Sequence, residues 1–311
     1  MNRLTAVIAV IATALLVGHA EADAPRILTD IAPIYSLVTL VVGDKAKVEL
    51  MLDKGQDPHS FQLRPSQARA LSQSDLIIWT GPQMQPLMED LIATYDKSTQ
   101  SLALLQSQGT YLRQAEHNEH DHEDVHEDAE TANAALSQDA IDPHAWLDLK
   151  NAQTWVQTIA DRLSTQDPQH SAFYQTNAKS AAVRFVRLDA EMAKLLAPVK
   201  NKGFVVSHDA LGYLVQAYGL NLVDAVSTID AQSPSAAHVA QLNKAFVNQE
   251  VVCFFPEIGH DPKLGAQLAN LTGVKIGAPL DPGGLGLAPM PDLYENLMRQ
   301  TAQTLRDCLA E

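Results

Sequence analysis

Cationic residues are scarce in this chain of 311 residues, where 22 Lys and Arg stand against 37 Asp and Glu and leave a formal net charge of −15. Nucleic acids and anionic membranes are bound through clusters of Lys and Arg, so neither is expected as a partner. Beyond the N-terminus, the sequence lacks any apolar run of about 20 residues, the length that a helix needs to cross a bilayer. With 46% hydrophobic and 19% charged residues, the chain is expected to be globular.

The motifs of common enzyme classes are missing as well. The sequence contains no H-E-x-x-H, no G-x-S-x-G, no Walker A motif and no G-x-G-x-x-G that opens a helix after a strand. The nearest approach, Gly283-Gly284-Leu285-Gly286, follows Asp281-Pro282 and is interpreted as a flexible loop. We therefore expect a binding protein and not an enzyme.

The N-terminus has the pattern of a secretory signal peptide, with an apolar run over residues 4–17 and an A-x-A cleavage site at Ala20-Glu21-Ala22. Residues 1–22 are thus predicted to be a Sec-type signal peptide that is cleaved near Ala22, and the mature chain to be exported and soluble. The two cysteines of the chain are Cys253 and Cys308. An even count in an oxidising compartment predicts one disulfide between them, and two buried free thiols are the alternative.

Short β-branched runs alternate with helical patterns from Arg26 onwards, which is typical of α/β layering. The expected strands cover 26–29, 47–52, 76–79, 204–207, 221–226, 251–255 and 275–278. The expected helices cover 33–42, 65–73, 83–95, 211–218, 235–248, 262–271 and 291–309. Between the halves, residues 172–196 form a helical pattern without Gly or Pro, which is roughly 37 Å long at 1.5 Å per residue.

The predicted fold class is therefore α/β, with two lobes of central β-sheets flanked by helices and joined by one long linking helix. We place the N-terminal lobe at 23–165, the linking helix at 166–200 and the C-terminal lobe at 201–311.

Residues 116–130, EHNEHDHEDVHEDAE, differ in composition from the rest of the chain. They contain eight carboxylates and no basic residue, together with His117, His120, His122 and His126. Such a segment cannot bury a core and is predicted to be a disordered loop. It is either a solubilising insertion or, as we favour, a weak site for a divalent transition metal.

One tripeptide, Asp-Pro-His, occurs twice and places His59 and His144 after prolines that stiffen their loops. His208 follows the expected strand 204–207, and Asp281 follows the expected strand 275–278. Open α/β sheets bind ligands at the carboxyl ends of their strands. Three neutral imidazoles and one carboxylate would form a tetrahedral Zn²⁺ site, although imidazole also suits Cu, Ni and Fe. Taken singly, each of these histidines is more often a polar loop or core residue than a ligand.

Further polar residues are weaker candidates for the same site. Glu257 and His260 follow the expected strand 251–255, and Glu257 is an alternative carboxylate ligand or a hydrogen-bond partner of a ligand. His170 and His238 lie in polar helical patterns and are expected to contact solvent.

At these residues the chain resembles the metal-binding class of ABC-transporter solute-binding proteins, and within it the periplasmic zinc-binding proteins of the ZnuA type. The resemblance covers almost the whole mature chain. Besides the three histidine contexts, it rests on residues 61–66, 79–82, 142–147, 207–213 and 280–282, on the acidic His-rich insertion and on the late cysteine pair. It implies two α/β lobes, a long linking helix and a metal in the cleft between the lobes.

The resemblance also assigns roles to individual residues. It matches His59, His144 and His208 to three imidazole ligands and Asp281 to the carboxylate ligand of the wider class. Pro58 stands where some zinc-binding relatives have Glu, which leaves Asp281, Glu257 or a water as the fourth ligand. Manganese-binding relatives tend to have a carboxylate at the position of His208, which favours zinc.

The function implied by the resemblance is capture of Zn²⁺ in the periplasm and its delivery to the inner-membrane permease of an ABC transporter. We expect a monomer, and a periplasmic metallochaperone is a further candidate partner. The alternatives are a manganese or iron transport protein and a secreted zinc hydrolase.

Overall fold

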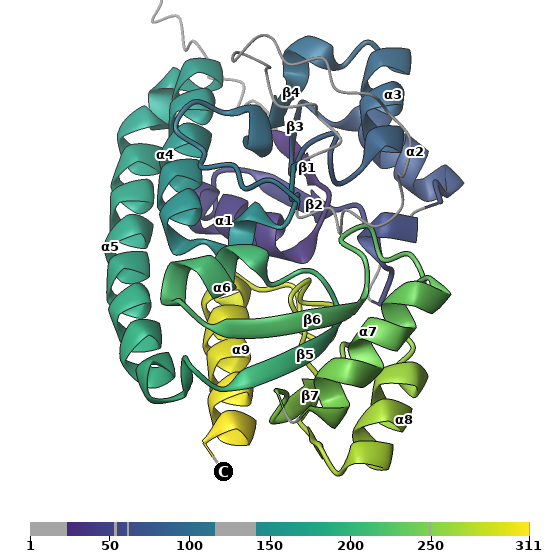
Figure 1. Ribbon diagram of the computed structural model, residues 1–311. Helices are drawn as coiled ribbons and strands as arrows, with labels where there is room; N and C mark the ends of the chain where they lie inside the picture. Colours follow the sequence, from purple (N-terminus) through teal and green to yellow (C-terminus); the bar gives the residue numbers. More distant parts are fainter. Residues whose placement is uncertain (1–23, 53–54, 61, 116–140, 249, 311) are drawn as a thin grey trace, which may run out of the picture.

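The computed structural model describes residues 24–52, 55–60, 62–115, 141–248 and 250–310. Its strands form two four-stranded parallel sheets flanked by helices, which confirms the predicted α/β fold (Figure 1). The predicted signal peptide, residues 1–22, and the His-rich loop, residues 116–130, lie outside the described residues. Within the described ranges, none of the helices combines the length and the apolar content that a membrane crossing requires.

The N-terminal sheet has the strand order β2-β1-β3-β4. Its strands are β1 (Arg26–Thr29), β2 (Lys47–Leu50), β3 (Leu76–Trp79) and β4 (Ser101–Ala103). The helices of this lobe are α1 (Ala32–Val42), α2 (Pro65–Gln73) and α3 (Pro86–Thr94), each with a proline in its first turn, where the missing N–H removes no helical hydrogen bond. The sequence did not predict β4, because Ser-Leu-Ala contains no β-branched residue and is only three residues long.

The C-terminal sheet repeats this order as β6-β5-β7-β8. Its strands are β5 (Gly203–His208), β6 (Asn221–Ser227), β7 (Cys253–Phe255) and β8 (Lys275–Ile276), and its helices are α6 (Gly212–Tyr218), α7 (Ala236–Val247) and α8 (Lys263–Thr272). β7 begins two residues later than predicted and β8 ends two residues earlier. In both sheets the strand order reverses between two neighbouring parallel strands, β1 and β3 in the first sheet and β5 and β7 in the second. The carboxyl ends of the strands at such a point are where α/β sheets bind ligands.

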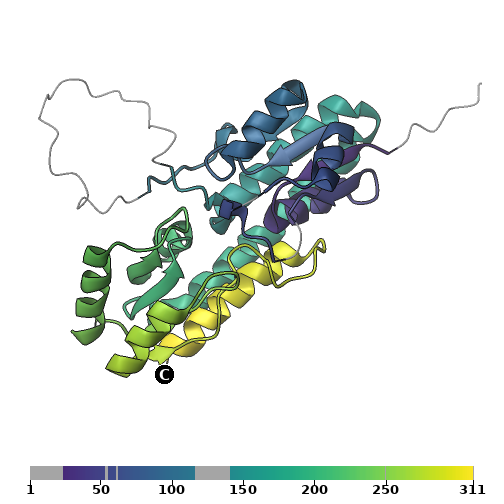
Figure 2. The same ribbon diagram turned by 90° about the vertical axis from the view of Figure 1, so that its right-hand side faces the viewer.

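The predicted long helix is α5 (Ser171–Leu196), which runs along one side of both lobes (Figures 1 and 2). The helix α4 (Leu149–Gln166) packs beside its upper half in Figure 1, next to the N-terminal lobe. The 26 residues of α5 extend over about 39 Å at 1.5 Å per residue. The buried positions, spaced three or four residues apart as one stripe requires, are Tyr174, Ala178, Ala181, Phe185, Leu188, Met192 and Leu196. This stripe packs on α1, α4 and α9 (Leu293–Leu309). The helix is confirmed, whereas the lobe boundaries at 165 and 200 stay a prediction.

One hydrophobic cluster extends across both lobes, and each lobe has a smaller cluster of its own. The extended cluster of buried side chains includes Ile34 of α1, Phe185 of α5, Phe204 of β5 and Leu305 of α9. The predicted disulfide is present, with an S–S distance of 2.06 Å between Cys253 of β7 and Cys308 of α9. It fastens the last helix, which also packs on α1 and α5, to the C-terminal sheet.

Candidate metal centre

The two Asp-Pro-His tripeptides fold in the same way. The side chain of Asp57 accepts a hydrogen bond from the backbone N–H of His59, and that of Asp142 accepts one from the N–H of His144, both at 2.9 Å. A bond from Asp to the N–H two residues on makes an Asx turn, and the proline between adds its fixed φ. Each histidine is therefore presented from a stiff turn.

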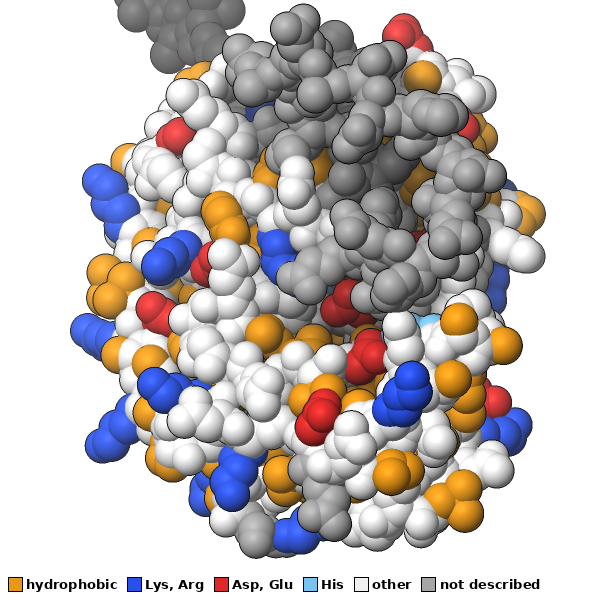
Figure 3. Space-filling view, in the orientation of Figure 1, with side chains coloured by type: hydrophobic (Ala, Val, Ile, Leu, Met, Phe, Trp, Pro, Cys, Tyr) orange, Lys and Arg blue, Asp and Glu red, His pale blue; other side chains and the backbone are white. Residues whose placement is uncertain are grey.

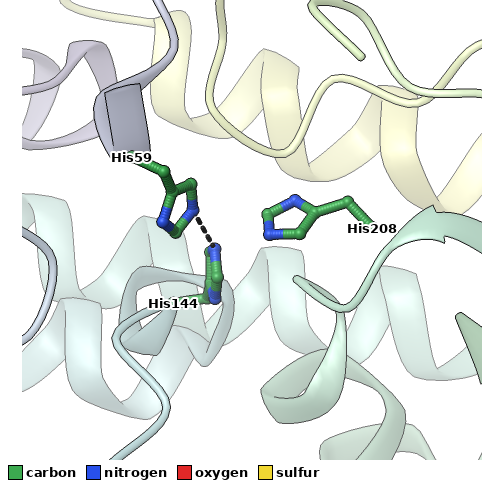
Figure 4. Close-up of side chains that lie close together, drawn as sticks. All are labelled: His59, His144 and His208. Atoms are coloured by element: carbon green, nitrogen blue, oxygen red, sulfur yellow. Dashed lines mark hydrogen bonds between the residues drawn. The ribbon is translucent and has the colours of Figure 1, made fainter. Parts of the chain in front are cut away.

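Three of the predicted histidines come together from three separate segments (Figure 4). His59 lies in the short 3-10 helix η1 (Pro58–Ser60) after β2, His144 directly precedes the 3-10 helix η5 (Ala145–Leu147), and His208 is the last residue of β5. Their ring centroids are 5.3, 5.0 and 5.1 Å apart, so the rings form a nearly equilateral triangle. Each ring places a nitrogen within 4.8 Å of the other two.

The spacing of these nitrogens suits zinc. The Nε2 atoms of His59 and His144 are 3.3 Å apart. In a tetrahedral site with Zn–N bonds of about 2.0–2.1 Å, two ligand nitrogens are separated by roughly 3.3–3.4 Å. Since imidazole is a preferred zinc ligand, the three rings could form the imidazole part of a tetrahedral zinc site.

His144 is oriented by a buried carboxylate. Its Nδ1–H donates to Asp142 at 2.9 Å, and the other oxygen of Asp142 accepts from Arg113, also at 2.9 Å. This contact keeps the proton on Nδ1 and leaves the Nε2 lone pair free for a metal. Burial raises the pKa of the Asp142 carboxyl to about 6, against the opposing effects of the His144 N–H and of Arg113. The sequence analysis missed both residues. The Asp of the repeated tripeptide was an available signal for Asp142, whereas no local pattern indicates Arg113.

The three histidines differ in how readily they take a proton. Burial and the neighbouring His144 and His208 lower the pKa of His59 to about 3, and burial lowers the pKa of His144 well below its usual range. Burial acts in the same direction on His208, but its contacts with the Glu257 carboxylate at 3.2 Å and with the Ile229 carbonyl at 3.1 Å outweigh it and raise the pKa of His208. His59 and His144 are therefore neutral near pH 7.

The structure does not bring Asp281 into this group. Among the described residues, Asp281 belongs to neither cluster of mutually close ligand atoms. Its two oxygens accept hydrogen bonds from the backbone N–H groups of Leu285 at 2.7 Å and Gly286 at 2.9 Å, which close its own loop. Asp281 as the fourth ligand therefore stays a prediction.

The other predicted histidines lie elsewhere. His170 hydrogen-bonds to Asp167 at 2.7 Å and is partly exposed. His238, expected to contact solvent, is instead largely covered, and its Nε2 lies 2.8 Å from the carbonyl oxygen of Ala225. His117, His120, His122 and His126 lie outside the described residues.

Removing the charge of Asp142 is expected to weaken metal binding without removing a ligand. In Asp142→Asn the carboxylate that orients His144 is lost. Substitution of such a hydrogen-bond partner of a metal-bound histidine lowers metal affinity roughly 10- to 100-fold. Competition titration against a zinc chelator measures the change. Asp57→Asn is the matched control, because Asp57 holds a backbone N–H in the same turn; an equal loss in both variants would contradict this role.

The pH dependence of zinc affinity is expected to be set by His208. A raised pKa means that protons compete with zinc at His208 as the pH falls through that pKa, whereas His59 and His144 are already neutral. Below that pKa the log of Kd should therefore rise by about one for each unit that the pH falls, and more steeply once Asp142, whose pKa is about 6, also takes a proton. Titrations between about pH 5 and 8 test this. A slope of about three just below neutrality would mean that all three histidines bind protons together.

Comparisons with known proteins extend these observations. A family model described as zinc-uptake complex component A, periplasmic (ZnuA), matches residues 27–308. A high-affinity zinc uptake system protein ZnuA from Paracoccus denitrificans (strain Pd 1222) is 41% identical over 304 residues, which is 93% of each chain. A crystal structure of ZnuA superposes with a TM-score of 0.75 at 24% identity, covering 92% of this chain and 100% of the other. The solute-binding protein FpvC from Pseudomonas aeruginosa, in complex with Mn²⁺, gives the same TM-score at 23% identity, covering 92% and 99%.

Proposed function

The chain belongs to the ZnuA family of periplasmic zinc-uptake components, and from this premise we propose that it captures Zn²⁺ between its lobes and delivers it to an inner-membrane ABC transporter. The observation that carries the proposal is the triangle of His59, His144 and His208, whose ring centroids are 5.0–5.3 Å apart. His59 and His144 come from one lobe and His208 from the other, so a bound ion would bridge both.

Zinc is favoured over manganese by the donor atoms. Three imidazole nitrogens suit zinc, whereas manganese prefers more oxygen. The fold alone does not distinguish zinc from manganese binding, because FpvC in complex with Mn²⁺ has a similar fold. Carboxylates do lie on the face in Figure 3, beside a small visible area of histidine, and they would attract any divalent cation.

We propose Asp281 as the fourth ligand in the zinc-bound protein, with Glu257 as the alternative. A parallel β-bridge pairs Glu257 with Leu280, so Asp281 directly follows the segment that runs beside Glu257. Asp281→Asn keeps an oxygen that can accept from the loop N–H groups while removing the charge, and Glu257→Gln is its matched partner. A larger loss of zinc affinity in Asp281→Asn would support Asp281, and the reverse would support Glu257.

The family is periplasmic, and further details of location and partners are proposals. We propose a signal peptide cleaved near Ala22, a monomeric protein and a metallochaperone as a second partner besides the permease. We also propose that the loop over residues 116–130 collects zinc near the site, because His alternates there with carboxylate. Unchanged zinc transfer and unchanged growth in scarce zinc after deletion of the loop would rule this out.

The proposed function is tested by the metal content and metal preference of the mature protein. We expect one tightly bound zinc per chain that excess Mn²⁺ does not displace. The ring of Trp146 lies 5.2 Å from that of His144, so its fluorescence should report zinc binding, and Trp146→Phe should abolish the signal. A preference for Mn²⁺, or the absence of a tight zinc site, would contradict the proposal.

A further inference from the structure

A tight turn after β7 brings two more metal-binding side chains together. The backbone N–H of His260 donates to the carbonyl of Glu257 at 3.3 Å, which closes a four-residue turn. Gly259, the third residue of this turn, has a φ of +97°, a conformation that glycine adopts without strain. The turn places the imidazole of His260 next to the carboxylate of Glu257, with Nε2 and Oε1 3.4 Å apart.

The same carboxylate also faces His208. Glu257 Oε1 is 3.2 Å from Nδ1 of His208, and the rings of His208 and His260 are stacked with centroids 4.7 Å apart. The three side chains are only 3%, 9% and 12% exposed for His208, Glu257 and His260. One ligand atom from each lies within 4.8 Å of the other two.

These contacts have the spacing and the chemistry of a zinc site. The distances from Glu257 Oε1 to the nearest nitrogens of His208 and His260 are 3.2 and 3.4 Å. Neighbouring ligand atoms of a tetrahedral zinc with bonds of about 2.0–2.1 Å are separated by roughly 3.3–3.4 Å. Two imidazoles and one carboxylate are a donor set found at zinc. We propose that His208, Glu257 and His260 form a second zinc-binding site on the C-terminal lobe.

The second site differs from the first in what it requires of the fold. His208 ends β5, while Glu257 and His260 follow β7, so all three residues come from one lobe. The first site needs His59 and His144 of the other lobe as well. The second site can therefore hold zinc before the two lobes jointly bind it.

Because the two sites share His208, they compete. A neutral imidazole has one nitrogen lone pair for a metal, and its other nitrogen carries a proton. Zinc on the nitrogen that faces His59 and His144 leaves Nδ1–H to donate to Glu257, as metal-bound histidines usually do. Binding at one site thus excludes binding at the other, and the wild-type protein still holds one zinc in this region.

The choice of zinc as the ligand rests on the proposed function. The test measures zinc binding at the second site in a protein from which the first site has been removed. The background is the full mature chain with His59→Ala and His144→Ala, in which the four loop histidines are also changed to Ser. We expect this protein to bind about one Zn²⁺, more weakly than the wild-type protein does. Co²⁺ should give the visible absorption bands of a tetrahedral site.

Further substitutions in that background decide the question. His260→Ala and Glu257→Gln should each weaken binding at least 30-fold and remove the Co²⁺ bands. The control His238→Ala, in the same lobe but outside the cluster, should leave both unchanged. Thermal unfolding shows whether each variant folds, and His260→Gln replaces His260→Ala if the latter does not.

Two results would overturn the second site. The background protein could bind no zinc, or it could bind zinc equally well with and without His260 and Glu257, in which case Glu257 only orients His208. Neither result would affect the single tight zinc of the wild-type protein, whose absence would instead count against the proposed function.

Discussion

Alanine in place of any one of His59, His144 and His208 is expected to weaken zinc binding by about 100- to 700-fold. Zinc sites of four ligands bind with about 10–16 kcal/mol, so one ligand is worth roughly 3–4 kcal/mol, and about 1.4 kcal/mol corresponds to a factor of ten. The three rings are equivalent in geometry, so the three losses should be similar in size. Competition with a chelator of known affinity measures each Kd.

The control for these substitutions is His238→Ala. This histidine belongs to the same lobe as His208, is also largely covered and bonds to a backbone carbonyl, but it lies outside both clusters of ligand atoms. Its substitution should leave zinc affinity within about twofold. The measurements are made without the loop histidines, because His residues at 117, 120, 122 and 126 would otherwise bind zinc by themselves. A site histidine whose removal changed Kd no more than His238→Ala does is not a ligand.

Most of the fold could be predicted from the sequence because the buried strands are short and rich in branched apolar residues. Leu76–Trp79 is buried at every position and was recognised as a strand from its composition. The strand Ser101–Ala103 has no such composition, and its pairing with β3 depends on contacts between residues far apart in the chain. The long helix α5 was predictable because no Gly or Pro interrupts it and its buried positions recur every three or four residues.

The site was predictable to the extent that local motifs mark it. The repeated Asp-Pro-His pointed to His59 and His144, since the same Asx turn presents each of them, and the end of a strand pointed to His208. The contact of Asp142 with the ring of His144, the hydrogen bonds of Asp281 within its own loop and the stacking of His260 on His208 depend on how loops fold back. Spacing along the chain carries no information about such contacts.

Removing the disulfide is expected to lower the free energy of unfolding of the metal-free protein by about 4 kcal/mol. The bridge closes a loop with a sequence separation of 55 residues, and in the chain-entropy model a loop of this size restricts the unfolded chain by roughly that amount. For a chain of this size the change corresponds to a fall in Tm of roughly 8 °C. Calorimetry or circular dichroism of Cys253→Ser/Cys308→Ser against the oxidised protein measures it.

The comparison is made without metal, because zinc at about 1,000 times its Kd would add about 4 kcal/mol to the stability of each protein, and any difference in zinc affinity would then add to the measured difference. Zinc affinity itself should change little. Cys253 is the first residue of β7 and is fully buried, and removal of the bridge to α9 should leave the Asp-Pro-His turns and the end of β5 in place. Reduction of the wild-type protein should reproduce the loss of stability, since both treatments free the same loop. A variant as stable as the oxidised protein would contradict this prediction. It would mean that the unfolded chain gains no freedom when the bridge is lost, for example because segments that form α9, α1 and α5 already associate in it.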